Sequence, residues 1–482
     1  MRRNALVLLV LASLPGCMVG PDYRSPDPVL PDRWKSSRDP ANGLKPISEN
    51  TLRNWWKTFN DPTLDRLIDR AQRGNLDLQM AFARIEQARA ERLANRADLF
   101  PKVGGVAVPA RFDNMLPSQD QQQGPSATNF FLAGFDAIWE VDVFGRLRHK
   151  LEAAGAVTDS ATENYREAWV VLTAEVARAY TEYRNLQNQL RITQANLSSQ
   201  RHTLDLTQQL FDEGVGTRYD VARARAQAES TEARIPALEA GLTTLQHHLE
   251  VLVGEKPGAL QMQLAAPADL PNSAARQLLT TPADTLRYRP DVRMAERDLA
   301  AATAIQGAAF AEFFPKISIA AFAGFQNSDL ENLFRSTAFS YASGSAIMQP
   351  IFNFGRIRAG VDLADARQKE AYLKYEKTVL EALREAETAM NQFLKEEQRR
   401  QKLVRSITDL KESWRLADLR YREGISTFLD VLDAERILYL EELSLAQSQA
   451  QTTLYLIALY KALGGAGHLE VKPVDEPIRP WG

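Results

Sequence analysis

The sequence is poor in the residues that build disulfides, metal centres and nucleic-acid interfaces. Its 482 residues include one cysteine, so no disulfide can form within the chain. Five histidines show no metal-ligand spacing, and the adjacent His247 and His248 cannot share one face of a helix. The 58 lysines and arginines are outnumbered by 61 aspartates and glutamates, which argues against nucleic-acid binding. We expect neither a metal nor a nucleic acid as a partner.

Catalytic motifs are also missing. The chain contains no Walker phosphate-binding loop and no nucleophile elbow, so it is not expected to hydrolyse ATP. We therefore expect no enzyme activity and no cofactor. Any energy that the protein needs must come from a partner.

The first residues have the layout of an export signal. Two arginines precede an apolar run, Ala5 to Leu14, which is too short to span a bilayer. The run ends in Leu-Pro-Gly-Cys, which resembles the lipobox of bacterial lipoproteins, where the cysteine is acylated after cleavage. We expect a signal peptide over residues 1–16 and lipidation of Cys17. The alternative is that Cys17 is removed together with the signal.

The segments at the two ends of the mature chain lack a helical period. Residues 17–60 are expected to form a lipid-anchored extended arm, because prolines prevent regular helix in its first part: Pro21, Pro26, Pro28 and Pro31. At the other end, residues 471–482 are expected to form a C-terminal tail. The material between them must supply the fold.

That material contains the same pattern twice. Matching segments recur at an offset of 214 residues and then of 210 residues: 77–87 with 291–301, "LFPKV" at 99–103 with "FFPKI" at 313–317, and "FGRLR" at 144–148 with "FGRIR" at 354–358. The change of four residues falls in a longer polar loop of the first copy. Two copies of about 200 residues indicate a duplicated structural unit. We place them at 61–262 and 280–470 and expect each to fold in the same way.

Each copy carries two short segments with the alternation of a strand. Between Phe131 and Val143 every second residue is apolar, and acidic residues fall on the other face. The other strands are expected near 103–112, 316–325 and 339–352. Their lengths suit tilted membrane strands of about 9–11 residues, although a soluble hairpin would explain any one of them. Because four strands cannot close a barrel and open edges are not viable in lipid, several subunits must share one barrel.

Long proline-free runs follow each pair of strands. Residues 146–211 and 356–421 predict helices of about 65 residues. In the second run, apolar residues from Leu403 to Tyr421 recur with coiled-coil spacing. Polar residues interrupt the corresponding seam of the first run: Thr193, Gln200 and Thr207. The two hairpins should therefore pack differently, and rods this long are expected to stand beside rods of other subunits.

The long helices end in two similar turns, "DEGVGTRYD" and "REGISTFLD". Gly214 and Gly424 stand where a left-handed residue stops a helix. A threonine and an aspartate with nearly the spacing of a capping box follow in each turn: Thr217 with Asp220, and Thr427 with Asp430. Each turn is thus predicted to be a helix-stop-helix tip. A ring of such tips at one end of a tube can dock a partner.

Together these features resemble the TolC-like outer-membrane factors, most closely their NodT-type lipoprotein branch. The resemblance covers nearly the whole chain, from "LPGCMVGPDY" through both "FPK" and "FGR" marks to the tips "GVGTRYDVARA" and "GISTFLDVLDAE". It implies a mainly α fold with membrane β: a homotrimer with a twelve-stranded outer-membrane barrel, four strands per subunit, on a long periplasmic helical barrel. It also implies an efflux duct in the outer membrane of a Gram-negative bacterium. Its partners would be outer-membrane lipid, a periplasmic adaptor (membrane fusion) protein and an RND-type inner-membrane transporter.

The same resemblance implies roles for residues of the tips. Asp430 and Asp433 match acidic positions that ring the periplasmic entrance, where crowded carboxylates favour cations. Tyr421 and Asp220 match positions that keep the entrance shut through hydrogen bonds between neighbouring helices. Ser426 stands where an arginine assists this latch, which implies a weaker or differently built latch. The adaptor is expected to dock at the tips: Gly214, Gly216, Thr217, Gly424, Ser426 and Thr427.

Two other functions remain open from the sequence. A duct for protein secretion would have the same architecture, and a lipid-anchored coiled-coil scaffold would need the helices without the barrel. The tip acids favour a duct, because a scaffold has no use for a carboxylate ring; otherwise they are solvated residues at a helix start. Within the efflux ducts, the lipoprotein branch favours drugs, solvents or metal ions as cargo.

Overall fold

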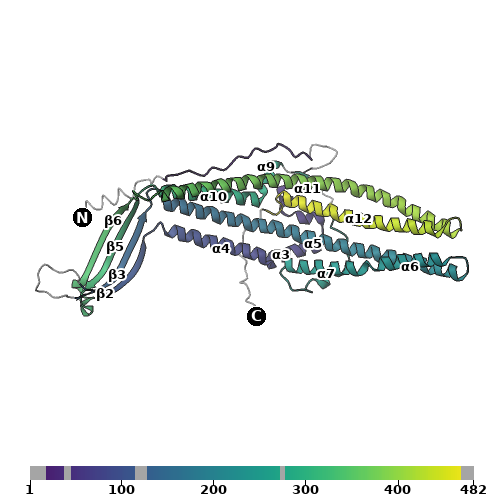
Figure 1. Cartoon of the computed structure of the whole chain (residues 1–482), viewed down its shortest axis with the longest axis horizontal. Coiled ribbons are helices and arrows are strands. Elements are labelled where there is room, and N and C mark those ends of the chain that lie inside the picture. Colours follow the sequence, from purple (N-terminus) through teal and green to yellow (C-terminus); the bar gives the residue numbers. More distant parts are fainter. Residues whose placement is uncertain (1–17, 37–44, 114–126, 272–276, 280, 468–482) are drawn as a thin grey trace. The chain divides into compact units, whose positions relative to one another are not determined.

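The computed structural model describes residues 18–36, 45–113, 127–271, 277–279 and 281–467 (Figure 1). The chain splits into two compact units, which we describe separately. Unit 1 comprises Met1–Asp27, Arg84–Ala161 and Ala295–Tyr375, and unit 2 comprises Pro28–Ala83, Thr162–Met294 and Glu376–Gly482. The expected signal peptide, Cys17 and the C-terminal tail 471–482 lie outside the described residues.

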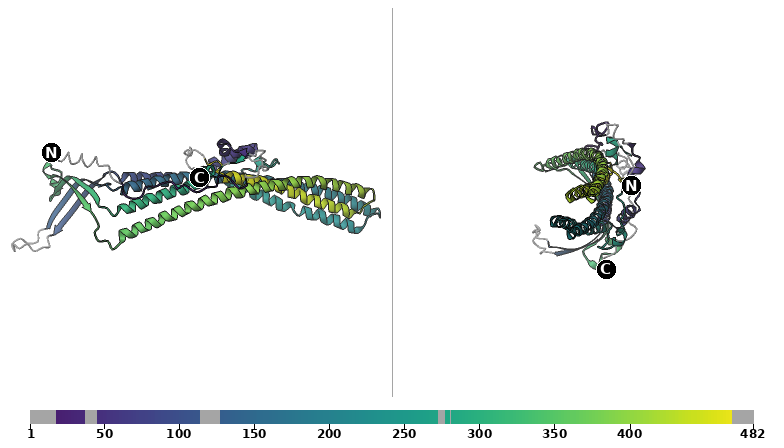
Figure 2. Two further views of the ribbon diagram at one scale, coloured as in Figure 1. Left: turned by 90° about the horizontal axis from the view of Figure 1, so that it is seen from above. Right: turned by 90° about the vertical axis from the view of Figure 1, so that its right-hand side faces the viewer.

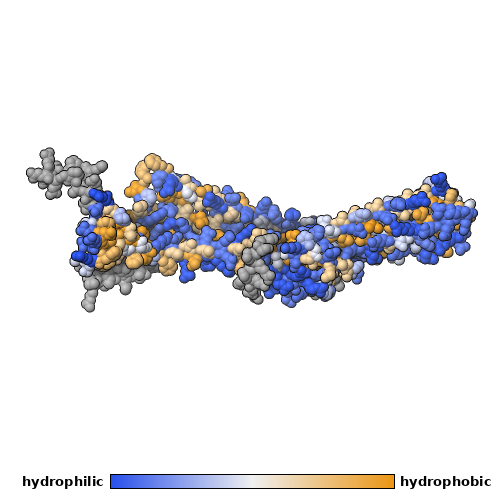
Figure 3. Space-filling model, turned by 90° about the horizontal axis from the view of Figure 1, so that it is seen from below, coloured by the Kyte–Doolittle hydropathy of each residue, from blue (hydrophilic) through white to orange (hydrophobic). Residues whose placement is uncertain are grey.

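Unit 1 contains a four-stranded antiparallel sheet in the order β2-β3-β5-β6. The strands are β2 Lys102–Asp113, β3 Ala127–Val141, β5 Lys316–Asn327 and β6 Phe339–Met348. All four predicted strands are therefore present. The sheet is twisted, as views from two directions show (Figures 1 and 2). Hydrophobic side chains form much of its visible surface (Figure 3), and nearly every residue of the edge strand β6 is exposed.

The two repeats have the same strand register. Lys102 pairs with Ile138 in the first hairpin, and Lys316 pairs with Met348 in the second. These positions correspond through the sequence offsets, since 102 + 214 = 316 and 138 + 210 = 348. A hydrogen bond is duplicated as well: Trp139 Nε1 donates to the carbonyl of Leu99 at 2.9 Å, and Gln349 Nε2 donates to that of Phe313 at 3.0 Å. The duplication read from the sequence is thus present in the backbone.

Helices form most of the remaining structure. Four of them belong partly to each unit: α4 Leu76–Ala97, α5 Arg146–Asp212, α10 Pro290–Ala311 and α11 Arg356–Arg422. The predicted long helices are confirmed, because α5 and α11 each have 67 residues without proline. The other helices of unit 2 are α2 Glu49–Arg53, α3 Pro62–Gly74, α6 Arg218–Glu232, α7 Ile235–Leu252, α8 Gln261–Leu264, α9 Pro282–Tyr288 and α12 Phe428–Ala462.

Short elements complete the two units. Unit 1 has 3-10 helices η3 Leu330–Asn332 and η4 Ser336–Ala338 between β5 and β6. Unit 2 has the 3-10 helix η2 Trp55–Phe59 and a small parallel pair, β1 Lys45–Pro46 with β4 Gln277–Leu279. In the part of the chain that the structure describes, no helix combines the length and the apolar character needed to cross a bilayer.

The returning helices of the two hairpins differ. In the second repeat α12 is continuous over 35 residues, whereas in the first repeat the chain turns at Ala233 and Arg234 between α6 and α7. Pro236 explains the break, because proline lacks the N–H that would continue the helix and clashes with the preceding turn. The expectation that both copies fold identically is therefore wrong at this point.

The arm is extended only in part. In unit 1, the N–H of Val19 donates to the carbonyl of Phe144 at 3.2 Å, and the hydroxyl of Tyr23 donates to Glu296 at 3.1 Å. In unit 2, however, residues 49–59 form α2 and η2, which corrects the expectation of an extended arm to residue 60. The reason is burial of aromatic side chains, with Trp55 stacked on Tyr460 at 5.3 Å between ring centroids.

At the ends of the repeats in unit 2, two pairs of backbone segments approach each other so closely that a side chain would not fit without a shift. A Cβ at Gly254 would lie 2.1 Å from the carbonyl oxygen of Gly74, and one at Gly464 would lie 2.8 Å from the carbonyl carbon of Tyr288. These pairs also correspond by the repeat offsets, since 74 + 214 = 288 and 254 + 210 = 464. The same close backbone approach is therefore built twice.

We predict that Gly254→Ala destabilises the protein more than Gly258→Ala does. Both glycines have positive φ, +75° and +95°, so alanine at either site carries a conformational cost of about 1–2 kcal/mol. Only Gly254 adds a steric overlap with Gly74, worth about 1–3 kcal/mol more, because nothing lies within 4 Å of a Cβ at Gly258. Thermal unfolding of both variants measures the difference. Equal unfolding temperatures for the two variants would show that the backbone around Gly74 and Gly254 can move apart at little cost in free energy.

Candidate functional site at the helical tips

Both long helices stop at a left-handed glycine in unit 2. Gly214 has φ +79° and Gly424 has φ +71°. The next residue donates back into the helix in each case, Val215 N–H to Leu210 and Ile425 N–H to Arg420, both at 2.9 Å. These bonds satisfy carbonyl groups that the helix end leaves without a partner. The prediction for the two glycines is confirmed.

The chain re-enters a helix through a threonine and an aspartate. The hydroxyl of Thr217 accepts from the N–H of Asp220 at 3.2 Å and donates to its carboxylate at 2.6 Å. In the second tip, the N–H and the hydroxyl of Thr427 both donate to the Asp430 carboxylate, at 3.0 and 3.1 Å. The expected capping arrangement is therefore present in both turns. Asp430 has at least this structural role.

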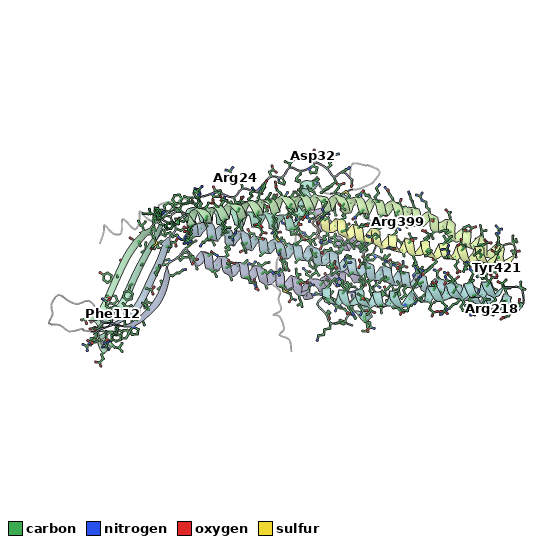
Figure 4. The ribbon with its side chains drawn as sticks, in the orientation of Figure 1. Arg24, Asp32, Phe112, Arg218, Arg399 and Tyr421 are labelled. Carbon is green, nitrogen blue, oxygen red and sulfur yellow. The ribbon has the colours of Figure 1, made fainter. Side chains whose placement is uncertain are left out.

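The two tips pack against each other. Ala224 of α6, Phe428 and Leu432 of α12 form a buried apolar cluster, and Leu204 of α5 and Tyr421 of α11 pack against it. The rings of Tyr421 and Phe428 lie 5.6 Å apart. Figure 4 shows Tyr421 and Arg218 near the two turns. The two tips thus share one apolar contact region.

The structure does not join the two residues of the expected latch within one subunit. No hydrogen bond links the Tyr421 hydroxyl to the Asp220 carboxylate, one oxygen of which accepts from Thr217. Burial raises the pKa of Tyr421, and the negative charge of Asp220 adds to this effect, so the two groups are close enough to interact. The Ser426 hydroxyl is buried and has no hydrogen-bond partner among the described residues.

Asp433 differs from Asp430 in its surroundings. It is exposed and pairs with Arg436 on the same helix at 2.8 Å. An exposed pair of this kind contributes about 0–1 kcal/mol, so it fixes the carboxylate only weakly. Asp433 can therefore respond to a neighbouring charge, whereas Asp430 is held by the helix start.

The expected docking residues surround two apolar side chains that the sequence reading did not single out. Val215 and Ile425 occupy equivalent positions, since 215 + 210 = 425, and are 77% and 66% exposed. Thr217, Gly424 and Thr427 around them are also exposed. Each tip thus presents a strongly exposed apolar side chain at the same position of a capped turn. A large apolar residue directly after the helix-stopping glycine, Val215 in "GVG" and Ile425 in "GIS", was the available signal.

A buried carboxyl group lies inside the tip region, and the sequence reading also missed it. Glu435 on α12 is 4% exposed, and its carboxylate accepts from the Ser199 hydroxyl of α5 at 2.7 Å. Its other oxygen has no partner among the described residues. Burial raises the pKa of Glu435, and Asp418 adds to this effect. The ionised form of Glu435 is therefore unfavourable in the folded tip.

The part of α5 that surrounds Ser199 buries other polar residues as well. Thr193, Gln200 and Thr207, which interrupt the heptad pattern, are all buried. The Thr193 hydroxyl lies 3.2 Å from that of Tyr439, one helical turn from Glu435. On this side of α5, polar residues of the first repeat therefore contact the second repeat. This agrees with the expectation that the two hairpins pack differently.

Comparison with known proteins identifies the same architecture. The family model described as "Outer membrane efflux protein" matches residues 67–255 and 281–465. Nodulation protein T of Rhizobium leguminosarum bv. trifolii is 31% identical over 94% of this chain and 95% of its own. The solvent efflux pump outer membrane protein SrpC of Pseudomonas putida is 32% identical over 96% and 98%. The solved outer-membrane channel OprN superposes with a TM-score of 0.87 at 35% identity, over 93% of this chain and 99% of that one.

We predict that Glu435→Gln stabilises the tips at neutral pH. Since folding raises the pKa of Glu435, ionisation of this group opposes folding above the ordinary glutamate pKa of about 4.3 and has no effect well below it. Glutamine keeps an acceptor for Ser199 without the charge. Hydrogen exchange of the tip amides should therefore slow at pH 7, and the difference from the parent should vanish as the pH falls below about 4.

The control is Glu423→Gln, which removes an exposed acid of the same tip and should leave exchange unchanged at either pH. A pH-independent loss of protection in Glu435→Gln would contradict the prediction. It would show that the Ser199 bond matters more than the charge.

Proposed function

The chain belongs to the outer membrane efflux protein family, and we propose that it is the exit duct of a tripartite pump for small apolar molecules. It is an outer-membrane efflux channel of a Gram-negative bacterium and extends into the periplasm. The fold class expected from the sequence, mainly α with a membrane sheet in a duplicated unit, is confirmed. The family is a family of transport channels.

The observation that carries the proposal is the open sheet of unit 1. Its outer strands, β2 and β6, each pair on one side only among the described residues. In hydrocarbon every unpaired N–H and C=O costs several kcal/mol, so an open sheet must close with others. Three copies supply twelve strands, more than the roughly eight at which side chains fill the interior of a barrel. A closed homotrimer, the assembly that the family resemblance implies, would satisfy every edge.

Lipidation of Cys17 completes the attachment to the outer membrane. Cys17 lies outside the described residues, but it is covalently next to Met18, whose segment is hydrogen-bonded to unit 1 through Val19. Acyl chains on Cys17 would add to the apolar surface that the barrel gives to lipid.

The tips are the proposed docking surface for a periplasmic adaptor. Val215 and Ile425 are exposed apolar side chains on turns whose backbone is fixed by caps and left-handed glycines. Such rigid apolar knobs suit insertion between helices of a partner. Through the adaptor, an RND-type inner-membrane transporter would supply the energy that this chain has no motif to obtain.

The cargo is proposed from relatives. SrpC is named as a component of a solvent efflux pump, and TtgI of Pseudomonas putida as a component of a toluene efflux pump. We infer that this chain also passes small apolar molecules. Protein secretion is the less favoured alternative, because none of these relatives is named for it.

We predict a small, cation-selective resting conductance that depends on Asp430 and Asp433. The variant with both Asp430→Asn and Asp433→Asn removes six charges from a trimer, and asparagine keeps an oxygen that can accept from Thr427. Because negative rings attract cations, the variant should conduct cations and anions nearly equally. Single-channel recording in planar bilayers measures this ratio.

Thr427→Ala is the matched control, since it weakens the cap by about 1 kcal/mol without changing charge. It should keep the cation selectivity. If the double asparagine variant also keeps it, the two aspartates do not ring the conduction path. If trimers in the bilayer conduct nothing at any voltage, the duct proposal itself loses its support or requires a docked adaptor for opening.

We also predict that Tyr421→Phe raises the resting conductance. Tyr421 is proposed to form the latch with Asp220 when the entrance closes, and loss of one such bond costs about 0.5–1.5 kcal/mol of the closed state. The first tip has a natural phenylalanine at the equivalent position, Phe211, so the substitution should not disturb the turn. The same bilayer recording gives the open probability. An unchanged value would exclude the hydroxyl as part of the latch.

A further inference from the structure

A pocket of about 730 Å³ lies within unit 2, away from the helical tips. Its walls come from α5, α11 and α12 and from residues 267–271 of the linker that joins the two repeats. Arg400, which lines it, precedes the tip residue Tyr421 by 21 residues, roughly 30 Å of helix. Figure 4 labels Arg399, the residue before Arg400 on α11. Ligand pockets have volumes of about 300–1,000 Å³, so this one is large enough for a molecule of the size of a sugar.

The linker wall of the pocket is held at both ends. Arg184 of α5 is buried, and its guanidinium donates to the carbonyl of Ala266 at 2.7 Å. The hydroxyl of Thr453 on α12 donates to the carbonyl of Pro271 at 2.9 Å. The rings of Pro267 and Pro271 restrict the backbone further. This wall is therefore in place before a ligand arrives, which lowers the entropic cost of binding.

Two arginines give the pocket its positive charge. Arg191 of α5 is exposed, and one of its N–H groups donates to the Asn188 side chain at 2.8 Å. Arg400 donates through Nε and Nη2 to Glu397 at 2.9 and 2.8 Å. A guanidinium has five N–H groups, so both arginines keep donors without a partner among the described residues. Such donors bind carboxylates strongly, because the fork of the guanidinium matches the two carboxylate oxygens.

The other polar side chains of the pocket suit hydroxyl and amide groups. Neither amide atom of Gln449 has a partner among the described residues. The Thr452 hydroxyl donates to the carbonyl of Ser448 at 2.9 Å and can still accept a hydrogen bond. Asp269 of the linker is exposed and can accept from a ligand hydroxyl. Two arginines and one aspartate give the lining a formal charge of 2 − 1 = +1.

This combination of charge and neutral groups narrows the class of ligand. A net charge of +1 matches a single carboxylate, whereas a phosphate monoester carries about 1.5–2 negative charges at pH 7. Neutral donors and acceptors beside the arginines match the hydroxyl and N-acetyl groups of a sugar. Small apolar molecules, the proposed cargo, gain little from a charged lining whose groups they would desolvate. The pocket is therefore unsuited to the cargo of the duct.

The pocket is not part of the duplicated architecture. Arg191 corresponds to Gln401 of the second repeat, since 191 + 210 = 401, and Arg400 corresponds to Leu190 of the first, since 400 − 210 = 190. The linker between the repeats also occurs once in the chain. Packing of equivalent helices therefore does not account for the two arginines, which are specific to this junction.

We propose that this pocket binds a small saccharide that carries one carboxylate. Arg191 and Arg400 hold the carboxylate, and Gln449 and Thr452 bind the hydroxyl or N-acetyl groups. Because Arg191 belongs to the first repeat and Arg400 to the second, the ligand connects the two repeats at the linker. The site depends neither on the identity of the cargo nor on the gate at the tips.

Two sugars form a matched pair of probes. N-acetylmuramic acid and N-acetylglucosamine differ only in the lactyl group that carries the carboxylate. The full-length protein, purified in a detergent without a sugar headgroup, is titrated with each in a calorimeter. We expect one site per subunit and an affinity for N-acetylmuramic acid that is higher by about tenfold or more, the effect of a charge-assisted hydrogen bond. Equal affinities for the two sugars, or no binding of either at millimolar concentration, would overturn the proposal.

Substitutions in the pocket test the roles of its charges. Arg191→Gln and Arg400→Gln should each weaken binding of N-acetylmuramic acid by about tenfold and leave binding of N-acetylglucosamine unchanged. Asp269→Asn should strengthen binding of the acid, because it removes a like charge. Arg405→Gln is the matched control, since Arg405 is an exposed arginine of α11 that does not line the pocket.

Thermal unfolding separates a loss of binding from a loss of structure. If both arginine variants unfold at the temperature of the parent and bind N-acetylmuramic acid as tightly, the arginines do not hold the carboxylate and the proposal is wrong. If an arginine variant does not fold, Asp269→Asn decides, because an arginine with only a structural role gives no reason for tighter binding in that variant. Unchanged or weaker binding by folded Asp269→Asn would then overturn the proposal.

Discussion

The unpaired edge of a β-sheet is the constraint on which the rest of this structure depends. A strand in hydrocarbon has no water to satisfy its backbone, so the edges at β2 and β6 demand a partner. A chain with four strands cannot supply one by closing on itself. Assembly is therefore a condition of membrane insertion, and the duplicated sequence gives an economical way to meet it. Two similar repeats present similar edges, so the contact that joins repeats can also join subunits.

This constraint also explains what the sequence reading could predict. Strands and long helices have strong periodic signals, and both were found close to their observed ends, from the alternation before Phe144 to the proline-free run that ends at Arg422. The tips were equally readable, because glycine and the Thr-Asp spacing act over a few residues. The internal match supplied the duplication. Local rules and repetition together determined most of the fold.

What the sequence could not show depends on which elements lie opposite each other. The polar residues at Thr193, Gln200 and Thr207 signalled an unusual seam, but nothing in the heptad pattern named Glu435 as the group opposite it. The arm was read as extended because its prolines are conspicuous, while the helical turn at Trp55 depends on burial against Tyr460, about 400 residues away. The latch has the same difficulty. Tyr421 and Asp220 lie near each other, but no hydrogen bond joins them in the described subunit, so the latch stays a prediction.

The contact between the two repeats is held by polar and charged groups as well as by packing. Ser160 donates to Asp298 at 2.5 Å, Ser199 donates to Glu435 at 2.7 Å, and Arg293 pairs with Glu163 at 2.8 Å. The partners in each contact are more than 100 residues apart in the sequence, so each contact forms only when the two repeats meet in one register. A buried acid such as Glu435 would lose its hydrogen bond in any other register, which is costly for a group without access to water. These contacts therefore specify which arrangement forms, and the backbone ladder between β3 and β5 and the stacked rings of Phe144 and Phe314 add to its stability.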